Sequence, residues 1–173
     1  MKRVVITGMG IYSCIGKNLE EVKTSLYNGK SGIVYDQERK DFGYRSPLTG
    51  MVESPNLKKQ LSRRERISLG DEGAYAYVAT IEALENAKLT QDYIDKNEVG
   101  ILYGNDSTAK AVVDSVDKIR EKKDTTLVGS GAIFKAMNST VTMNLSTLFK
   151  LTGVNFTISA ACASGSHAIG MAY

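Results

Sequence analysis

Three short runs of apolar and β-branched residues have the pattern of strands buried on both faces of a sheet. They are RVVITG at 3–8, VGILYG at 99–104 and GVNFTISA at 153–160. Such runs are continuous rather than alternating, because helices cover both faces of a parallel sheet. We therefore predict three strands, with the first in a central position.

Between these runs the apolar positions repeat at helical spacing. Leu19, Val22 and Leu26 share one face after Asn18, a residue type that caps helix N-termini. By the same criteria, with Asn138 as the cap of the fourth, helices are predicted over residues 19–28, 71–87, 109–122, 139–150 and 162–173. The alternation of strands and helices indicates an α/β fold with a mainly parallel sheet.

Residues 30–70 interrupt this alternation. Both prolines and several glycines lie between 30 and 60, with one short candidate strand near 49–52. Residues that form turns at this density are typical of a surface excursion. The remaining sheet would be small, and its last helix ends near a third turn. We therefore expect 1–173 to be one incomplete unit of a longer protein.

Composition narrows the class of protein. The 173 residues are 42% hydrophobic and 24% charged, as in soluble globular proteins. With 22 basic and 19 acidic residues, the net charge of +3 is too small to indicate nucleic-acid binding. No apolar run approaches the roughly 18 residues of a membrane span, and the N-terminal run lacks the pattern of a signal peptide. We expect a cytoplasmic protein with neither nucleic acid nor membrane as partner.

The glycine-rich segment TGMGIYSCIG at 7–16 resembles a dinucleotide-binding turn only in part. The third position of the G-x-G-x-x-G pattern is Ser13, and the next helix begins near Asn18, too late for its N-terminus to hold a pyrophosphate. A tight turn is the better interpretation, with Cys14 as a small packed residue. Cys14 and Cys162 have neither metal-ligand spacing nor the pattern of a disulfide framework, so we expect no metal.

The segment LSRRERISLG at 61–70 concentrates positive charge in Arg63, Arg64 and Arg66. It is either a solvated helical face or a docking patch for an acidic partner or a phosphate, since the guanidinium fork matches both. The residues alone leave both interpretations open.

The segment FTISAACASGSHAIG at 156–170 holds the strongest candidate for chemistry, Cys162. A strand, a turn of small residues and a helix of small residues form the layout of a nucleophile elbow. At a helix N-terminus, unpaired N–H groups and the dipole favour a thiolate and can stabilise a substrate oxyanion. The alternative is an inert buried thiol, the usual role of a cysteine.

The chain's only histidine, His167, is a poor base for this thiol. Five helical residues correspond to a rotation of about 140° and a rise of about 7.5 Å, which points the imidazole away from Cys162. We expect a packing or interface histidine, and any base for Cys162 must come from another segment.

Residues 3–33 and 153–170 together resemble the β-ketoacyl-acyl carrier protein synthases, the condensing enzymes of bacterial fatty-acid synthesis, most like types I and II. The most specific element, SAACASGSHAIG, matches the family's nucleophile motif. The resemblance implies a thiolase-like fold, layered α-β-α-β-α in the complete protein, with this chain as most of the N-terminal half. It also implies that Cys162 is the nucleophile, with its backbone N–H in the oxyanion hole, and that two histidines, a lysine and a second oxyanion donor follow in the other half.

The implied reaction is a decarboxylative condensation. An acyl group held as a thioester on Cys162 condenses with malonyl-acyl carrier protein, without a cofactor, and the 173 residues alone would be inactive. The implied partners are acyl carrier protein, acyl and malonyl thioesters, and a second copy paired through strand 155–160. By similarity, Met137 and Ser107 fall at the acyl pocket, and the carrier protein docks on Arg63, Arg64 and Arg66.

One segment departs from the family's pattern. Where relatives show a glycine-rich run, GNDSTAK at 104–110 places Asn105, Asp106, Ser107 and Thr108 near the expected pocket mouth. The acyl-chain preference is therefore open, and a polyene or other specialised condensing enzyme is included. Two further alternatives are a non-catalytic partner subunit and a thiolase-type acyltransferase that uses coenzyme A.

Overall fold

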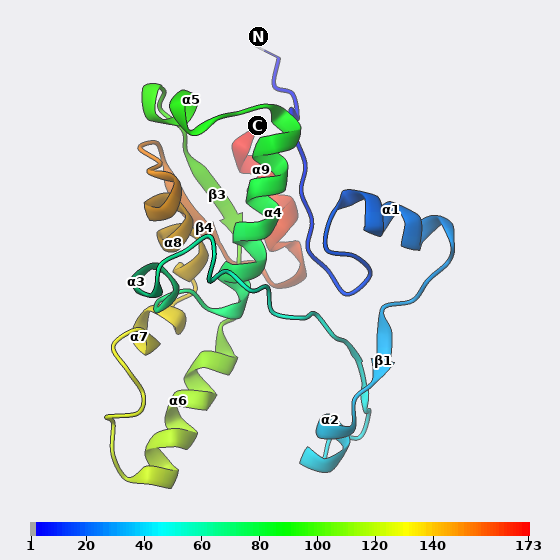
Figure 1. The fold of residues 1–173 in the computed structure, drawn as a ribbon, viewed down its shortest axis with the longest axis vertical. Coiled ribbons are helices and arrows are strands. Elements are labelled where there is room, and N and C mark those ends of the chain that lie inside the picture. Colours follow the sequence, from blue (N-terminus) through cyan, green and yellow to red (C-terminus); the bar gives the residue numbers. More distant parts are fainter. Residues whose placement is uncertain (1–2) are drawn as a thin grey trace.

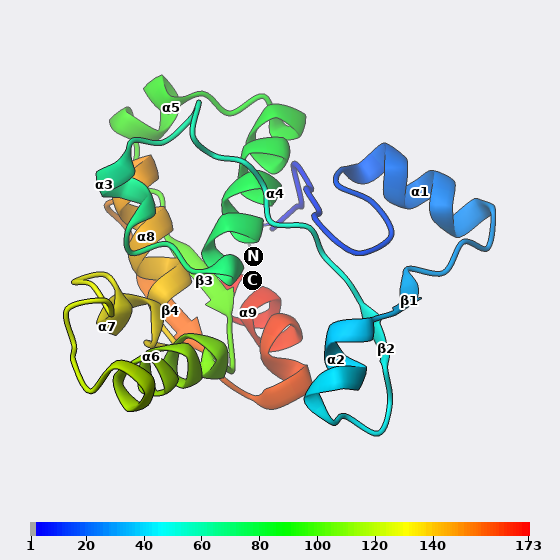
Figure 2. The ribbon, with the colours of Figure 1, turned by 60° about the horizontal axis from the view of Figure 1, so that its bottom comes forward.

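A pair of parallel strands lies between two helices at the centre of the fold. In the computed structural model, which describes residues 3–173, β3 (Ile101–Gly104) pairs with β4 (Asn155–Ile158) in parallel, with Ile101 opposite Asn155 and Gly104 opposite Ile158. Helices α8 (Thr140–Phe149) and α9 (Ser164–Ala172) cover opposite faces of this pair (Figures 1 and 2). The arrangement confirms the predicted α/β class and the parallel pairing.

The remaining elements pack around this centre or project to one side of it (Figures 1 and 2). The helices are α1 (Leu19–Tyr27), α2 (Gln37–Phe42), α3 (Arg63–Arg66), α4 (Asp71–Ala87), α5 (Gln91–Lys96), α6 (Ala109–Lys122) and α7 (Ala132–Lys135). Strands β1 (Ile33–Tyr35) and β2 (Leu48–Gly50) form an antiparallel pair. With α2, they extend away from the rest of the chain (Figure 1).

The hydrophobic core forms where α4 packs against α8. Val141 and Leu145 are 0% and 1% exposed, and the rings of Tyr77 and Phe149 stack with centroids 5.6 Å apart. The excursion at 30–70 contributes buried side chains to this core: Leu57, Leu61 and Leu69. Its second half is therefore a structural part of the domain, contrary to the expectation of a mostly surface segment.

The predicted central strand at 3–8 is not a strand in the structure. Val4, Val5 and Ile6 are 51%, 71% and 78% exposed, and this run pairs with no strand among residues 3–173. The chain instead lies along α4, so closely that a Cβ on Gly10 would be 1.9 Å from the carbonyl oxygen of Ala79. An apolar run shows that a segment is suited to burial, but it does not supply the neighbouring strand that a ladder requires.

The predicted helices are confirmed, with differences at their ends. The Asn18 side chain caps α1 by accepting the N–H of Glu21 at 2.9 Å. Asn138 does not cap α8: the N-cap is Ser139, and no side chain satisfies that helix end. Among residues 3–173, no helix combines the length and hydropathy that crossing a bilayer would require.

Candidate active site

Cys162 lies in a tight turn between the end of β4 and the start of α9. The turn is a single 3₁₀ segment, Ala161–Ala163, and Cys162 is exposed. Ala161 has a φ of 48°, in the left-handed region that is unfavourable for any residue with a Cβ. Local strain of this kind is held in place only by its surroundings, and it clusters at functional sites. The strand, turn and helix predicted around Cys162 are thus observed, with α9 beginning two residues later than expected.

A small network of hydrogen bonds fixes this turn. The hydroxyl of Ser164 accepts the N–H of Ala160 at 2.9 Å and donates to the carbonyl oxygen of Ala161 at 2.7 Å. The N–H of Ala163 donates to the carbonyl oxygen of Ala160 at 3.0 Å. These bonds close the backbone on either side of Cys162, so that the thiol is presented from a defined conformation.

Asp106 bonds to the same turn from the end of β3. Its Oδ1 accepts the N–H of Ala161 at 3.0 Å and also the hydroxyl of Ser159. The hydrogen bond from Ser159, followed by that from the Ala161 backbone, lowers the pKa of Asp106, so the carboxylate stays ionised at neutral pH. The sequence placed Asp106 near the pocket mouth but assigned it no role. The signal was an acidic residue two positions after the end of a parallel strand, where loops of neighbouring strands meet.

The other polar residues of this loop do not reach the turn. Asn105 and Thr108 are buried, and their side chains donate to the carbonyl oxygens of Asn138 and Ala136 at 2.8 and 2.9 Å. Ser107 is exposed, and its hydroxyl accepts the N–H of Ala109. Asn105 and Thr108 therefore attach the β3–α6 loop to the segment before α8.

Of the two residues expected at the acyl pocket, Ser107 lies in the loop two residues before α6, and Met137 is exposed between α7 and α8. Their assignment to an acyl pocket stays a prediction.

His167 lies on α9 with its side chain exposed. Within residues 3–173 no hydrogen bond joins it to Cys162, in agreement with the helical geometry that argued against it as a base. The His167 side chain is therefore not packed inside this chain. Of the two expected roles, packing or interface, only the interface role stays a prediction.

The three arginines differ in their surroundings. They form the short helix α3, which begins with a capping box between Ser62 and Glu65. Arg63 and Arg64 are exposed, whereas Arg66 is half-buried and donates through Nε to the carbonyl oxygen of Leu61 at 3.1 Å. Two of the three guanidinium groups are thus presented to solvent.

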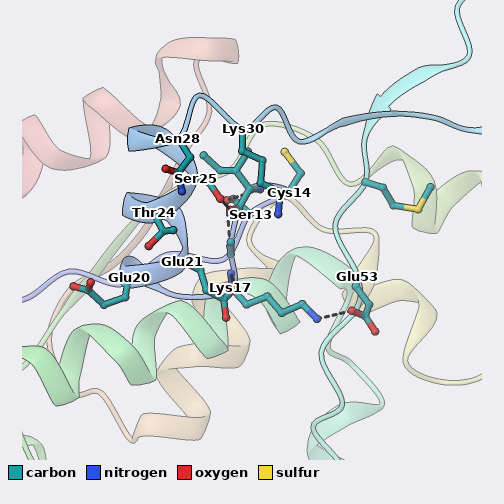
Figure 3. A pocket seen from close by; sticks show the side chains of 13 residues that line it. Ser13, Cys14, Lys17, Glu20, Glu21, Thr24, Ser25, Asn28, Lys30 and Glu53 are labelled. Carbon is teal, nitrogen blue, oxygen red and sulfur yellow. Dashed lines mark hydrogen bonds and ion pairs between the residues drawn. The ribbon is translucent and has the colours of Figure 1, made fainter.

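A separate hollow of about 730 Å³ is lined in part by Cys14 (Figure 3). Lys17 and Glu53 form an ion pair at its edge, which lowers the pKa of Glu53 and raises that of Lys17. Cys14 is half-buried: a Cβ on Gly32 would lie 2.7 Å from its sulfur, so one side is closely packed, as predicted, whereas another side lines the hollow. Ser13 and Gly16 pair across a tight turn ahead of α1, which confirms the preferred interpretation of the glycine-rich segment.

In the described part of the chain, no three His, Cys, Asp or Glu side chains are arranged to hold a metal ion.

Comparison with known proteins gives a consistent result. The family model described as "Beta-ketoacyl synthase, N-terminal domain" matches residues 1–173. Two proteins named 3-oxoacyl-[acyl-carrier-protein] synthase 1, from Buchnera aphidicola subspecies Schizaphis graminum and Baizongia pistaciae, are 41% and 40% identical over 100% and 99% of this chain.

A crystal structure of a β-ketoacyl synthase from Burkholderia phymatum superposes with a TM-score of 0.87 at 30% identity, over the whole of this chain and 43% of its own length. The chain likewise spans 43% of the length of the two curated relatives. The chain therefore has the fold of ketosynthases, which is thiolase-like. The chain belongs to the β-ketoacyl synthase family, and its residues 1–173 correspond to the N-terminal domain of that family.

Proposed function

We propose that this chain carries the acyl-accepting nucleophile of a 3-oxoacyl-acyl carrier protein synthase that acts in fatty-acid or related polyene biosynthesis. The observation that carries the proposal is Cys162, exposed in a strained turn at the start of α9, in a chain of the β-ketoacyl synthase family. Backbone strain clusters at functional sites, and a nucleophile gains from a fixed presentation.

In the first step, the Cys162 thiolate attacks the carbonyl carbon of an acyl thioester. A carbon–sulfur bond forms, and the tetrahedral oxyanion then collapses, which breaks the bond to the carrier's sulfur and expels it as a thiolate. The N–H of Cys162 is proposed to donate to this oxyanion, because the N–H groups of Ala161 and Ala163 are directed to Asp106 and to Ala160. The acyl group is then held on the enzyme as a thioester.

In the second step, malonyl-acyl carrier protein loses CO₂ and the resulting carbanion attacks the thioester carbonyl. The new carbon–carbon bond gives a 3-ketoacyl thioester, and the Cys162 thiolate leaves. We assign assistance to decarboxylation to histidines outside these 173 residues, as the family resemblance implies. His167 does not fit this role, since it is exposed on α9 without a hydrogen bond to Cys162. Splitting the condensation into two steps is the general advantage of covalent catalysis.

The assembly we propose is a homodimer paired along β4. Phe156 is 54% exposed, and the edge of β4 away from β3 pairs with no strand in the described chain. An open apolar edge of this kind is normally covered. We also propose that the enzyme works in the cytoplasm, where a reducing environment keeps the free thiol of Cys162 in its reactive form.

The function is tested with the protein encoded by the whole open reading frame. Mixing it with acyl- and malonyl-acyl carrier protein should yield 3-ketoacyl-acyl carrier protein and CO₂, with a transient acyl adduct on Cys162 detected by mass spectrometry. Product formation only from coenzyme A thioesters, without CO₂, would instead identify a thiolase-type transferase. Activity that appears only after addition of another ketosynthase subunit would identify a non-catalytic partner.

Carrier-protein docking on α3 gives a separate prediction. Reversing the charge of Arg63 and Arg64 to glutamate should raise KM for acyl-acyl carrier protein about tenfold and leave kcat nearly unchanged, because rim charges steer encounter rather than chemistry. The matched control is the double variant Lys40→Glu and Arg45→Glu, with the same change of charge on exposed residues in and just after α2, away from α3 (Figure 2). Steady-state kinetics at low and high salt measure the effect. An equal rise of KM in both double variants would refute a specific patch.

A further inference from the structure

The carboxylate of Asp106 lies directly opposite the turn that presents Cys162. The N–H of Asn105 donates to the carbonyl oxygen of Ile158 at 3.1 Å, which extends the pairing of β3 and β4 one residue past Gly104. The next residues along the two strands are Asp106 and Ser159, and they bond through their side chains. Strand register therefore sets the position of the carboxylate.

The loop that carries Asp106 is anchored on both sides. Asn105 and Thr108 are buried, and each donates a hydrogen bond to the backbone of the segment that leads into α8. A carboxylate on an anchored loop can hold a neighbouring segment in an unfavourable conformation, whereas one on a mobile loop would follow that segment instead.

The segment that Asp106 holds includes the strained residue. The N–H of Ala161, whose φ is 48°, donates to Oδ1 of Asp106 at 3.0 Å. The hydroxyl of Ser159 donates to the same oxygen. The lowered pKa of Asp106 agrees with a carboxylate that accepts both bonds in its ionised form.

We propose that Asp106 is a positioning residue of the nucleophile: by accepting the Ala161 N–H and the Ser159 hydroxyl, it holds the left-handed turn that aims the Cys162 thiol and its backbone N–H. Asp106 acts through the turn and does not touch the reacting atoms. The proposal rests on the function proposed above, in which Cys162 accepts the acyl group.

The test compares three variants of the whole-length protein. Asp106→Ala should slow acylation of Cys162 by acyl-acyl carrier protein about tenfold, the size of effect that a hydrogen bond to a charged group carries. Asp106→Asn should restore most of the rate, because both bonds go to a single oxygen that a carboxamide also offers. Ser159→Ala leaves the Ala161 bond in place and should have an intermediate effect.

Asp124→Ala is the matched control. That carboxylate also accepts a backbone N–H and a hydroxyl, both from Thr126, and its pKa is lowered for the same reason. It lies in the loop after α6, at the far end of that helix from the β3 loop (Figure 1). Its replacement should leave acylation unchanged.

A second measurement does not depend on activity. Hydrogen–deuterium exchange of the peptide that covers residues 159–165 should be faster in Asp106→Ala and close to wild type in Asp106→Asn. Wild-type rates of acylation and exchange in Asp106→Ala would overturn the positioning role, as would an Asp106→Asn protein as slow as Asp106→Ala. A wild-type protein that never forms the acyl-enzyme would refute the proposed function alone, and the exchange rates would still decide whether Asp106 holds the turn.

Discussion

Replacement of Cys162 by alanine is expected to abolish acyl transfer, with a loss on the order of a thousandfold or more. Without the sulfur there is no thioester, and a carbanion would have no enzyme-bound acyl group to attack. The variant should fold normally, because the side chain is exposed and makes no contribution to the core. Intact-protein mass spectrometry after mixing with acyl-acyl carrier protein measures the result directly.

Two control variants separate this effect from general damage. Cys14→Ala removes the second of the two thiols in residues 1–173, which lies at the turn before α1. This variant should still form the acyl-enzyme. His167→Ala should also retain acylation, since its imidazole is exposed and is not bonded to Cys162 within the described residues. An acyl adduct that persists in Cys162→Ala, or that disappears in Cys14→Ala, would contradict the assignment of the nucleophile.

The fold could be predicted from sequence where periodicity and local chemistry agree. The helix at 71–87 and the strands near 99–104 and 153–160 were identifiable because their apolar residues repeat with a clear period or form runs of strand length. The run at 3–8 is likewise a continuous stretch of apolar, β-branched residues. Its state depends on a neighbouring strand, however, and pairing partners are not encoded in the run itself.

The sequence predicts the turn around Cys162, but it does not predict the hydrogen bonds that hold this turn in place. Small residues after a strand predict a tight turn, and Cys162 is the nucleophile predicted within it. The hydrogen bond that Asp106 accepts from the Ala161 N–H joins residues 55 positions apart. It exists only because the register of β3 and β4 places the two strand ends side by side. No local pattern contains that information. The burial of Leu57 and Leu61 was unpredictable for the same reason, since it depends on the position of α4 and α8.

Gly104→Ala is expected to have the second largest effect, because it places a methyl group against the backbone of α9, the helix that follows the Cys162 turn. A Cβ at this position would lie 2.4 Å from the carbonyl carbon of Ser164 and 2.5 Å from the nitrogen of Gly165. These are backbone atoms of the first turn of α9, so no side-chain rotation relieves the overlap. Either β3 or α9 must move, and over-packing of this kind costs about 1–3 kcal/mol or more.

The displacement would fall on the residues that follow Cys162. A shift of about 1 Å in a reacting group lowers the rate roughly a hundredfold, so acylation should fall by that factor even in protein that remains folded. Thermal unfolding and acylation rates measure the two effects separately. Gly165→Ala is the control on the same helix. Apart from the chain neighbours and the adjoining backbone of α9 itself, a Cβ there meets no atom of residues 3–173 within 4 Å, so both quantities should stay nearly unchanged. Wild-type stability and activity in Gly104→Ala would show that α9 does not need its close approach to β3 to present the thiol.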